Sequence, residues 1–188
     1  MKGSPLKKQI IDNLQSLIKG LNAMIFASFD RYCTLHELDY EIASGKDKIA
    51  NGNIPLFGST GLLGKTTSPS FNEQLVLVAR VGSIGNVQFV NIPCGVSDNA
   101  IVIRCGAKAK YVYYYLKSYN FKRITSGTTQ PLITASDVRR IRIPIISEEK
   151  EIKIVEMLDS FNSKLDIEST ILMNLLKQKE FLLSNMLI

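Results

Sequence analysis

Residues 147–188 read SEEKEIKIVEMLDSFNSKLDIESTILMNLLKQKEFLLSNMLI and contain neither glycine nor proline. Apolar residues recur in this stretch at three- and four-residue spacing, which keeps them on one face of a helix. The start resembles a capping box around Ser147, although Lys150 holds the position usual for Glu. The stretch predicts one long helix that packs against another helix. Its packing residues are Leu158, Phe161, Leu165, Leu172, Leu175 and Leu182. Glu168 and Lys179 fall on the same face, where coiled coils use polar residues to fix alignment.

A shorter helix is predicted from Pro5 to about Phe26. Ser4 is a good N-cap, and Pro5 suits the first helical position. The apolar face of this helix includes Leu14, Leu17 and Leu21. At 1.5 Å per residue the two helices measure about 60 Å and about 33 Å, so a hairpin of the two leaves the far end of the longer one unpaired. We expect a second chain or another subunit to cover it.

The middle of the chain has a different character, because glycines punctuate short apolar runs. Segments 75–80, 87–90 and 100–104 are rich in Val and Ile and bounded by turn residues, which is typical of strands. Segment 111–119 favours a helix. The sequence therefore predicts an α/β domain between two helical ends. The predicted parts are residues 1–26, 27–146 and 147–188.

Composition narrows the class of protein. The chain has 188 residues, 45% apolar and 21% charged, which suits one compact domain with an extension. Its net charge of +6 favours contact with polyanions. Cys33, Cys94 and Cys105 lack the spacing of a metal site, and His36 is the single histidine, so neither a disulfide framework nor a zinc site is expected. The sequence shows no membrane-spanning run and no signal peptide, and we expect a cytoplasmic protein.

Several patterns resemble pieces of catalytic sites, but each has a simpler interpretation. The run from Gly58 to Thr66 approaches a phosphate-binding P-loop, yet Gly58 lies one residue too far from the Gly-Lys-Thr triplet, and Pro55 makes the preceding run a poor buried strand. The Glu151–Lys153 segment resembles half of a nuclease pair, but a solvated helix face explains it. An acid-base role for His36 would require a nucleophile, and the sequence identifies none. No loop of the Asn-Pro-Pro-Tyr type for base methylation is present. We expect no catalytic centre and no metal site.

Other patterns bear on nucleic-acid binding. The tyrosines at 111, 113, 114 and 115 either stack on unpaired bases or pack in the core, and their helical spacing favours the core. The glycine pair in the run from Arg80 to Gly85 favours a tight turn over direct ligand contact. Lys122 and Arg123 precede the polar run Ser126–Gln130. Positive charges position phosphates, and a Gln amide can pair with an adenine edge.

Taken in order, these segments resemble a specificity subunit of type I restriction-modification enzymes. The resemblance runs from about Leu35 to the C-terminus and rests on the order of the pieces as much as on their content. The pieces are IPLFGSTG (54–61), LVARVGSIGN (77–86), VSDNA (96–100), YYL (114–116), SGTTQP (126–131), IP (143–144) and the long helix.

The resemblance implies an α/β target-recognition domain that reads half of a split DNA site, and helices that bind methyltransferase subunits. Members of that family usually carry two recognition domains, so this chain, with one domain after a helix, resembles a C-terminal half. Its first helix is similar to the end of the family's central spacer, which implies antiparallel packing of residues 5–26 on the long helix. The implied partners are double-stranded DNA, methyltransferase and restriction subunits, and a second copy or another specificity half. S-adenosylmethionine, ATP and Mg²⁺ are then expected on the partner subunits, with no cofactor on this chain.

Segments shared among subunits that read different sequences are expected to build the scaffold and hold phosphates. We expect specificity in the polar stretches 46–53, 65–72 and 120–129. The candidate DNA contacts are Lys46, Lys48, Lys65, Thr66, Arg80, Ser83, Lys122, Arg123, Ser126, Thr128, Thr129 and Gln130. A coiled-coil adaptor whose globular domain binds protein is the alternative from another class, and a small P-loop-like enzyme is a third hypothesis.

Overall fold

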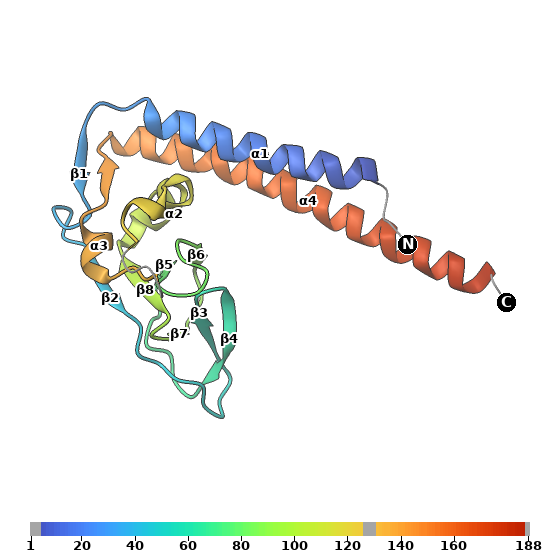
Figure 1. The fold of residues 1–188 in the computed structure, drawn as a ribbon, viewed down its shortest axis with the longest axis horizontal. Helices are drawn as coiled ribbons and strands as arrows, with labels where there is room; N and C mark the ends of the chain where they lie inside the picture. Colours follow the sequence, from blue (N-terminus) through green and yellow to red (C-terminus); the bar gives the residue numbers. More distant parts are fainter. Residues whose placement is uncertain (1–4, 126–130, 187–188) are drawn as a thin grey trace.

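The computed structural model describes residues 5–125 and 131–186 as an α/β domain on a stalk of two helices (Figure 1). Helices α1 (Pro5–Ala27) and α4 (Glu148–Met186) lie side by side and run in opposite directions. Because α1 has 23 residues and α4 has 39, the C-terminal end of α4 extends beyond α1. The predicted fold class is confirmed: an α/β domain with a long C-terminal helix and a shorter, antiparallel N-terminal helix.

A two-stranded ladder joins the stalk to the domain. Strand β1 (Tyr32–Thr34) follows α1 and pairs antiparallel with β9 (Arg142–Pro144), which precedes α4. The Tyr32 hydroxyl donates to the carbonyl of Phe26 at 2.7 Å, which ties the ladder to the end of α1. The chain therefore enters and leaves the domain at one place.

The main sheet is antiparallel, with four strands in the order β2-β8-β5-β6. The strands are β2 (Glu41–Ser44), β8 (Ala100–Arg104), β5 (Leu75–Ala79) and β6 (Val87–Val90). Successive side chains of a strand point to opposite faces. Val76 and Val78 accordingly face a core shared with the stalk, whereas Leu75 and Leu77 face a second core. The strands predicted at 75–80, 87–90 and 100–104 are confirmed.

Helix α2 (Ala109–Ser118) packs between the main sheet and the stalk (Figure 1). Its tyrosines are core residues: Phe26 of α1 makes edge contacts with Tyr111 and Tyr115, at ring-centroid distances of 5.6 Å and 5.3 Å. The Tyr111 hydroxyl donates to the carbonyl of Pro144 at 3.0 Å. Burial raises the pKa of Tyr115 to about 12. The core interpretation of the tyrosine run is confirmed for these positions.

A smaller sheet has the order β4-β3-β7, with β4 antiparallel and β7 parallel to β3. The strands are β3 (Ile54–Gly58), β4 (Gly61–Thr66) and β7 (Gly95–Val96). The doubt that Pro55 raised about this run is therefore wrong. β7 pairs only with Leu56 and Phe57, so Pro55 lies where β3 has a single neighbouring strand and one amide fewer is needed.

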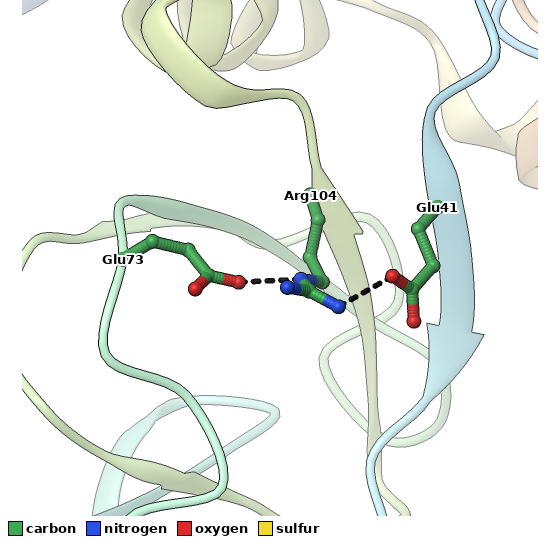
Figure 2. Close-up of polar contacts among 3 residues, drawn as sticks. All are labelled: Glu41, Glu73 and Arg104. Carbon is green, nitrogen blue, oxygen red and sulfur yellow. Dashed lines mark hydrogen bonds and ion pairs between the residues drawn. The ribbon is translucent and has the colours of Figure 1, made fainter.

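Arg104 at the end of β8 ties three segments of the domain surface together (Figure 2). One guanidinium nitrogen lies 2.5 Å from the carboxylate of Glu41 in β2, and another bonds Glu73, just before β5. The hydrogen bond to Glu73 is the main reason why the pKa of Arg104 is raised. Two acids thus neutralise this cation, which leaves it a poor candidate for contact with a polyanion.

Three short helices complete the domain: η1 (Gly106–Lys108), η2 (Phe121–Arg123) and α3 (Ala135–Arg139). A capping box starts α3, because the Thr134 and Asp137 side chains each bond the other residue's backbone N–H. None of the helices in the described ranges is long and apolar enough to cross a membrane. Cys94 and Cys105 are free thiols in the interior, and desolvation raises their pKa values to about 11 and about 12.

Candidate nucleic-acid interface

Three segments far apart in the sequence meet around one open groove of about 890 Å³. They are α1 at Lys19, the turn between β5 and β6, and the region from the end of α2 through η2. We call this the lysine groove, because Lys19, Lys117 and Lys122 line it together with Ser83, Asn86 and Asn120. The remaining lining residues include neither Asp nor Glu.

The β5–β6 turn is held in place by its two glycines. Gly82 and Gly85 have φ values of +70° and +77°, a region that L side chains rarely adopt. The amide of Asn86 donates to the carbonyl of Ser83 at 2.9 Å and closes the turn. A Cβ on Gly85 would lie 2.7 Å from the Phe121 side chain, so the missing side chain lets the turn pack against η2. The turn interpretation of this glycine pair is confirmed.

The same turn also binds the tip of the β3–β4 hairpin. The Asn86 side-chain amide donates to the carbonyl of Ser59 at 2.8 Å, and the Gln88 amide donates to the carbonyl of Gly58 at 2.8 Å. Because Asn86 lines the lysine groove, the hairpin tip and the groove belong to one continuous surface. The near P-loop sequence is thus a hairpin turn with a structural role.

The structure separates the predicted DNA contacts into groups. Ser83 and Lys122 line the lysine groove, and Arg123 is exposed beside Lys122. Arg80 is half-buried at the start of the turn, where its carbonyl accepts from the amide of Ile133 at 3.0 Å. Its Nε is buried without a hydrogen-bond partner among the described residues.

A second group lies beside strand β4. Lys46, Lys48 and Lys65 are exposed, and the amide of Ala50 donates to the carbonyl of Lys65 at 2.9 Å, so the 46–50 loop reaches β4 at Ala50. The carboxylate of Asp47 shapes this loop by accepting from the amide of Val96 at 2.7 Å and from the Ser70 hydroxyl at 2.6 Å.

Thr66 does not belong to the surface, contrary to the prediction. It is 7% exposed, and a Cβ on Gly95 would lie 2.9 Å from its methyl group. Thr66 therefore packs inside the small sheet, because the last residue of β4 turns inward where β7 approaches. Four further predicted contacts, Ser126, Thr128, Thr129 and Gln130, lie outside the described residues.

The groove also contains residues that sequence reasoning missed. Lys19 and Lys117 fall within the helices predicted at 5–26 and 111–119, and Asn86 ends the glycine-containing run at 77–86, so none of the three is a predicted contact. No local signal distinguishes Lys19 from other exposed lysines of an amphipathic helix. Only the contact of α1 with α2 brings it to the groove.

The predicted helix-packing residues differ in burial. Leu158 is fully buried, and Leu14, Leu21, Leu165 and Leu172 are half-buried. Leu17, Phe161, Leu175 and Leu182 are exposed, by 69%, 40%, 40% and 57%. Five of the predicted residues line an apolar groove of about 570 Å³ between α1 and α4. These five are Leu14, Leu17, Leu21, Phe161 and Leu165. We call it the stalk groove.

Glu151 and His36 are the two residues that the sequence compared with catalytic groups, and both take part in contacts that hold the fold together. Glu151 is 7% exposed and pairs with Lys108 at 2.9 Å, so it anchors α4 to η1 and does not lie on a solvated helix face as expected. His36 is exposed, and its amide donates to the carbonyl of Arg139 at 3.1 Å. Within residues 5–125 and 131–186 no cluster of His, Cys, Asp and Glu has the arrangement of a metal site.

A family model for the type I restriction modification DNA specificity domain matches residues 38–177. The chain belongs to this family. Relatives in this family include specificity subunits of type I systems, and these are non-catalytic. The resemblance stated from the sequence is therefore confirmed.

Related proteins agree with this assignment. The specificity subunit of the type I restriction enzyme EcoprrI from Escherichia coli is 25% identical over 112 residues, which are 58% of this chain and 28% of that protein. The crystal structure of the S subunit from M. genitalium has a TM-score of 0.70 at 20% identity, over 95% of this chain and 57% of that one.

Two further solved structures show the same fold. A chain from a study of assembly and conformational transition of the type I R-M system has a TM-score of 0.72 at 18% identity, over 95% of this chain and 53% of that one. The HsdS subunit from Thermoanaerobacter tengcongensis has a TM-score of 0.64 at 17% identity, over 88% of this chain and 47% of that one. The chain thus spans about half the length of the solved structures that it matches.

Proposed function

We propose that this specificity chain reads one half of a split target sequence on double-stranded DNA for a type I restriction-modification complex. The observation that carries the proposal is the lysine groove, which gathers cations without a carboxylate on a domain of the specificity family. A surface of this kind attracts the phosphate backbone of nucleic acid.

Phosphate binding and base reading fall to different groups of residues in this proposal. Contacts to phosphates set the position of a protein on the duplex, whereas contacts to base edges carry the sequence preference. The β5–β6 turn and the lysines beside it hold the backbone. The polar stretches 46–53, 65–72 and 120–129 choose the sequence, because their composition offers donors and acceptors to base edges.

The stalk supplies the connection to the rest of the complex. We infer that α1 and α4 bind methyltransferase subunits, that a restriction subunit joins them, and that a second recognition domain reads the other half-site. That domain comes from a second copy or from another specificity half. S-adenosylmethionine, ATP and Mg²⁺ then belong to the partner subunits, and the complex works in the cytoplasm.

Methylome sequencing tests the proposal in cells that express this chain with its methyltransferase subunit. We expect methylation at one bipartite sequence that disappears when the chain is omitted. Purified complex should also bind duplex DNA in a gel-shift assay. A complex that assembles but neither binds duplex nor directs methylation would contradict the proposal and favour the adaptor hypothesis.

A further inference from the structure

The lysine groove crosses the boundary between the recognition domain and the stalk. Lys19 comes from α1, Lys117 from the end of α2, and Lys122 from η2. Lys19 and Lys117 also line a smaller cavity of about 290 Å³ between α1, α2 and α4, so the two side chains stand at the seam where the domain meets the stalk.

Polar contacts among the three helices fix this seam. The buried Asn22 side-chain amide on α1 donates to the carbonyl of Tyr114 on α2 at 2.8 Å. The Tyr114 hydroxyl donates in turn to the carboxylate of Asp159 on α4 at 2.6 Å. Lys19 precedes Asn22 by three residues and Lys117 follows Tyr114 by three, so each lysine lies on the same helix face as its anchor. The anchors therefore hold the two lysines beside each other.

The lysines of the groove have no acidic partner within the parts of the chain that the structure describes. Lys108, Lys110, Lys153 and Arg104 all form ion pairs with carboxylates. Lys19, Lys117 and Lys122 form none, and the ammonium of Lys117 lies 5.5 Å from the centre of the Tyr113 ring. The charge of the groove is thus left for a ligand.

The chemistry of the groove favours a nucleic acid over a protein. Protein interfaces draw much of their affinity from buried aromatic and apolar anchors. None of the large apolar side chains that the described residues expose lines this groove, whereas several line the stalk groove. Cations spread along an open groove suit the spaced charges of a phosphate backbone.

We propose that Lys19 of the stalk and Lys117 of the domain together bind backbone phosphates of the duplex, next to the turn that Lys122 flanks. The inference rests on the proposed function. It makes the stalk part of the DNA-binding surface and not only a connector between subunits. The duplex is then fixed relative to the stalk, and so relative to the methyltransferase that binds there.

Salt titration of DNA binding tests this assignment on the full chain in complex with its methyltransferase subunit. The probe is a fluorescein-labelled duplex that carries the methylated sequence, compared with one of scrambled sequence. The variants are Lys19→Gln, Lys117→Gln and the double substitution, with Lys122→Gln in parallel. Lys150→Gln is the matched control, because Lys150 is exposed in the first turn of α4 and does not line the groove.

Each phosphate contact that is lost should lower the slope of log K against log salt by about 0.9. We expect that loss for each groove variant, about twice that loss for the double variant, and an unchanged slope for Lys150→Gln. The affinity ratio between the specific and scrambled duplexes should stay constant, because phosphate contacts carry no sequence information. Lys19→Arg and Lys117→Arg should restore the slope, which a merely structural role would not predict.

The outcomes separate this inference from the proposed function. If the wild-type complex binds duplex but Lys19→Gln and Lys117→Gln keep its slope, the stalk does not bind DNA and only this inference fails. If these variants instead weaken capture of the methyltransferase without changing the slope, the groove binds an acidic protein surface and the inference is again wrong. If the wild-type complex binds no duplex, the proposed function falls and this inference falls with it.

Discussion

Gly82 and Gly85 share a left-handed backbone conformation, but their surroundings differ. A Cβ on Gly82 would meet nothing within 4 Å, whereas a Cβ on Gly85 would lie 2.7 Å from Phe121. The two positions therefore separate the cost of the backbone conformation from the cost of close packing. Gly85 lies close to Phe121 of η2, and this close approach sets the position of the β5–β6 turn along the lysine groove.

We expect Gly82→Ala to lower the free energy of unfolding by about 1 kcal/mol, since only the left-handed conformation is penalised. Gly85→Ala should cost a further 1–3 kcal/mol or so, because the added methyl group displaces the Phe121 ring. Urea unfolding of the two variants beside the wild type measures the difference. Equal losses of unfolding free energy in the two variants would show that the Phe121 ring moves aside without destabilising the fold.

Long helix α4 serves two purposes along its length. Its first half contributes Leu158, Asp159 and Glu151 to contacts with α1, α2 and η1. Its second half exposes Ile171, Phe181 and Leu182, by 45%, 68% and 57%. The part of α4 that packs against α1, α2 and η1 is therefore expected to stabilise the isolated chain, and the exposed C-terminal end is expected to contribute little.

Leu158→Ala should lower the free energy of unfolding by about 2–5 kcal/mol, because the side chain is fully buried and leaves a cavity. Phe181→Ala is the control in the same helix and should change it by less than about 0.5 kcal/mol. Urea unfolding at low protein concentration measures both. A large loss for Phe181→Ala under those conditions would show that the far end already packs within one chain.

The whole molecule leaves a long apolar surface on its stalk. The stalk groove lies between α1 and the part of α4 around Phe161 and Leu165, and Phe181 and Leu182 are exposed farther along α4, towards its C-terminal end. The chain also spans about half of the solved structures that it matches, at 53% and 57% of two of them. An exposed apolar surface of this kind suits contact with another helix, so self-association through the stalk stays a prediction.

We expect the purified chain to have the mass of a dimer in light scattering at micromolar concentration. Leu17→Glu and Phe181→Glu place a charge on the stalk groove and on the far end of α4, and each should shift the population towards monomer. Circular dichroism checks that the variants stay folded. A monomeric mass for the wild type would contradict self-association and leave another specificity half as the partner.

Local spacing was enough to predict both stalk helices, α2 and three of the four strands of the main sheet, β5, β6 and β8. Segments 75–80, 87–90 and 100–104 are recognisable as strands because they are short, rich in Val and Ile and bounded by turn residues, and these properties are readable without any partner. The same holds for both stalk helices and for the tyrosines of α2. Spacing is less decisive about which residue of a broad apolar stripe faces a partner: Ile18 is half-buried where Leu17, one residue earlier, is exposed.

The sequence by itself determined the α/β domain, the helical stalk and the family, because periodicity, turn glycines and motif order are properties of neighbouring residues. Tertiary structure alone decided that Thr66 and Glu151 are buried, that Pro55 lies within a strand, and that Lys19 reaches the lysine groove. The burial of Thr66 and Glu151 and the position of Lys19 depend on segments distant in sequence, namely β7, η1 and the face of α2 that receives α1, and the place of Pro55 depends on its pairing with β4. Burial and charge clustering arise from such contacts, so no local pattern records them.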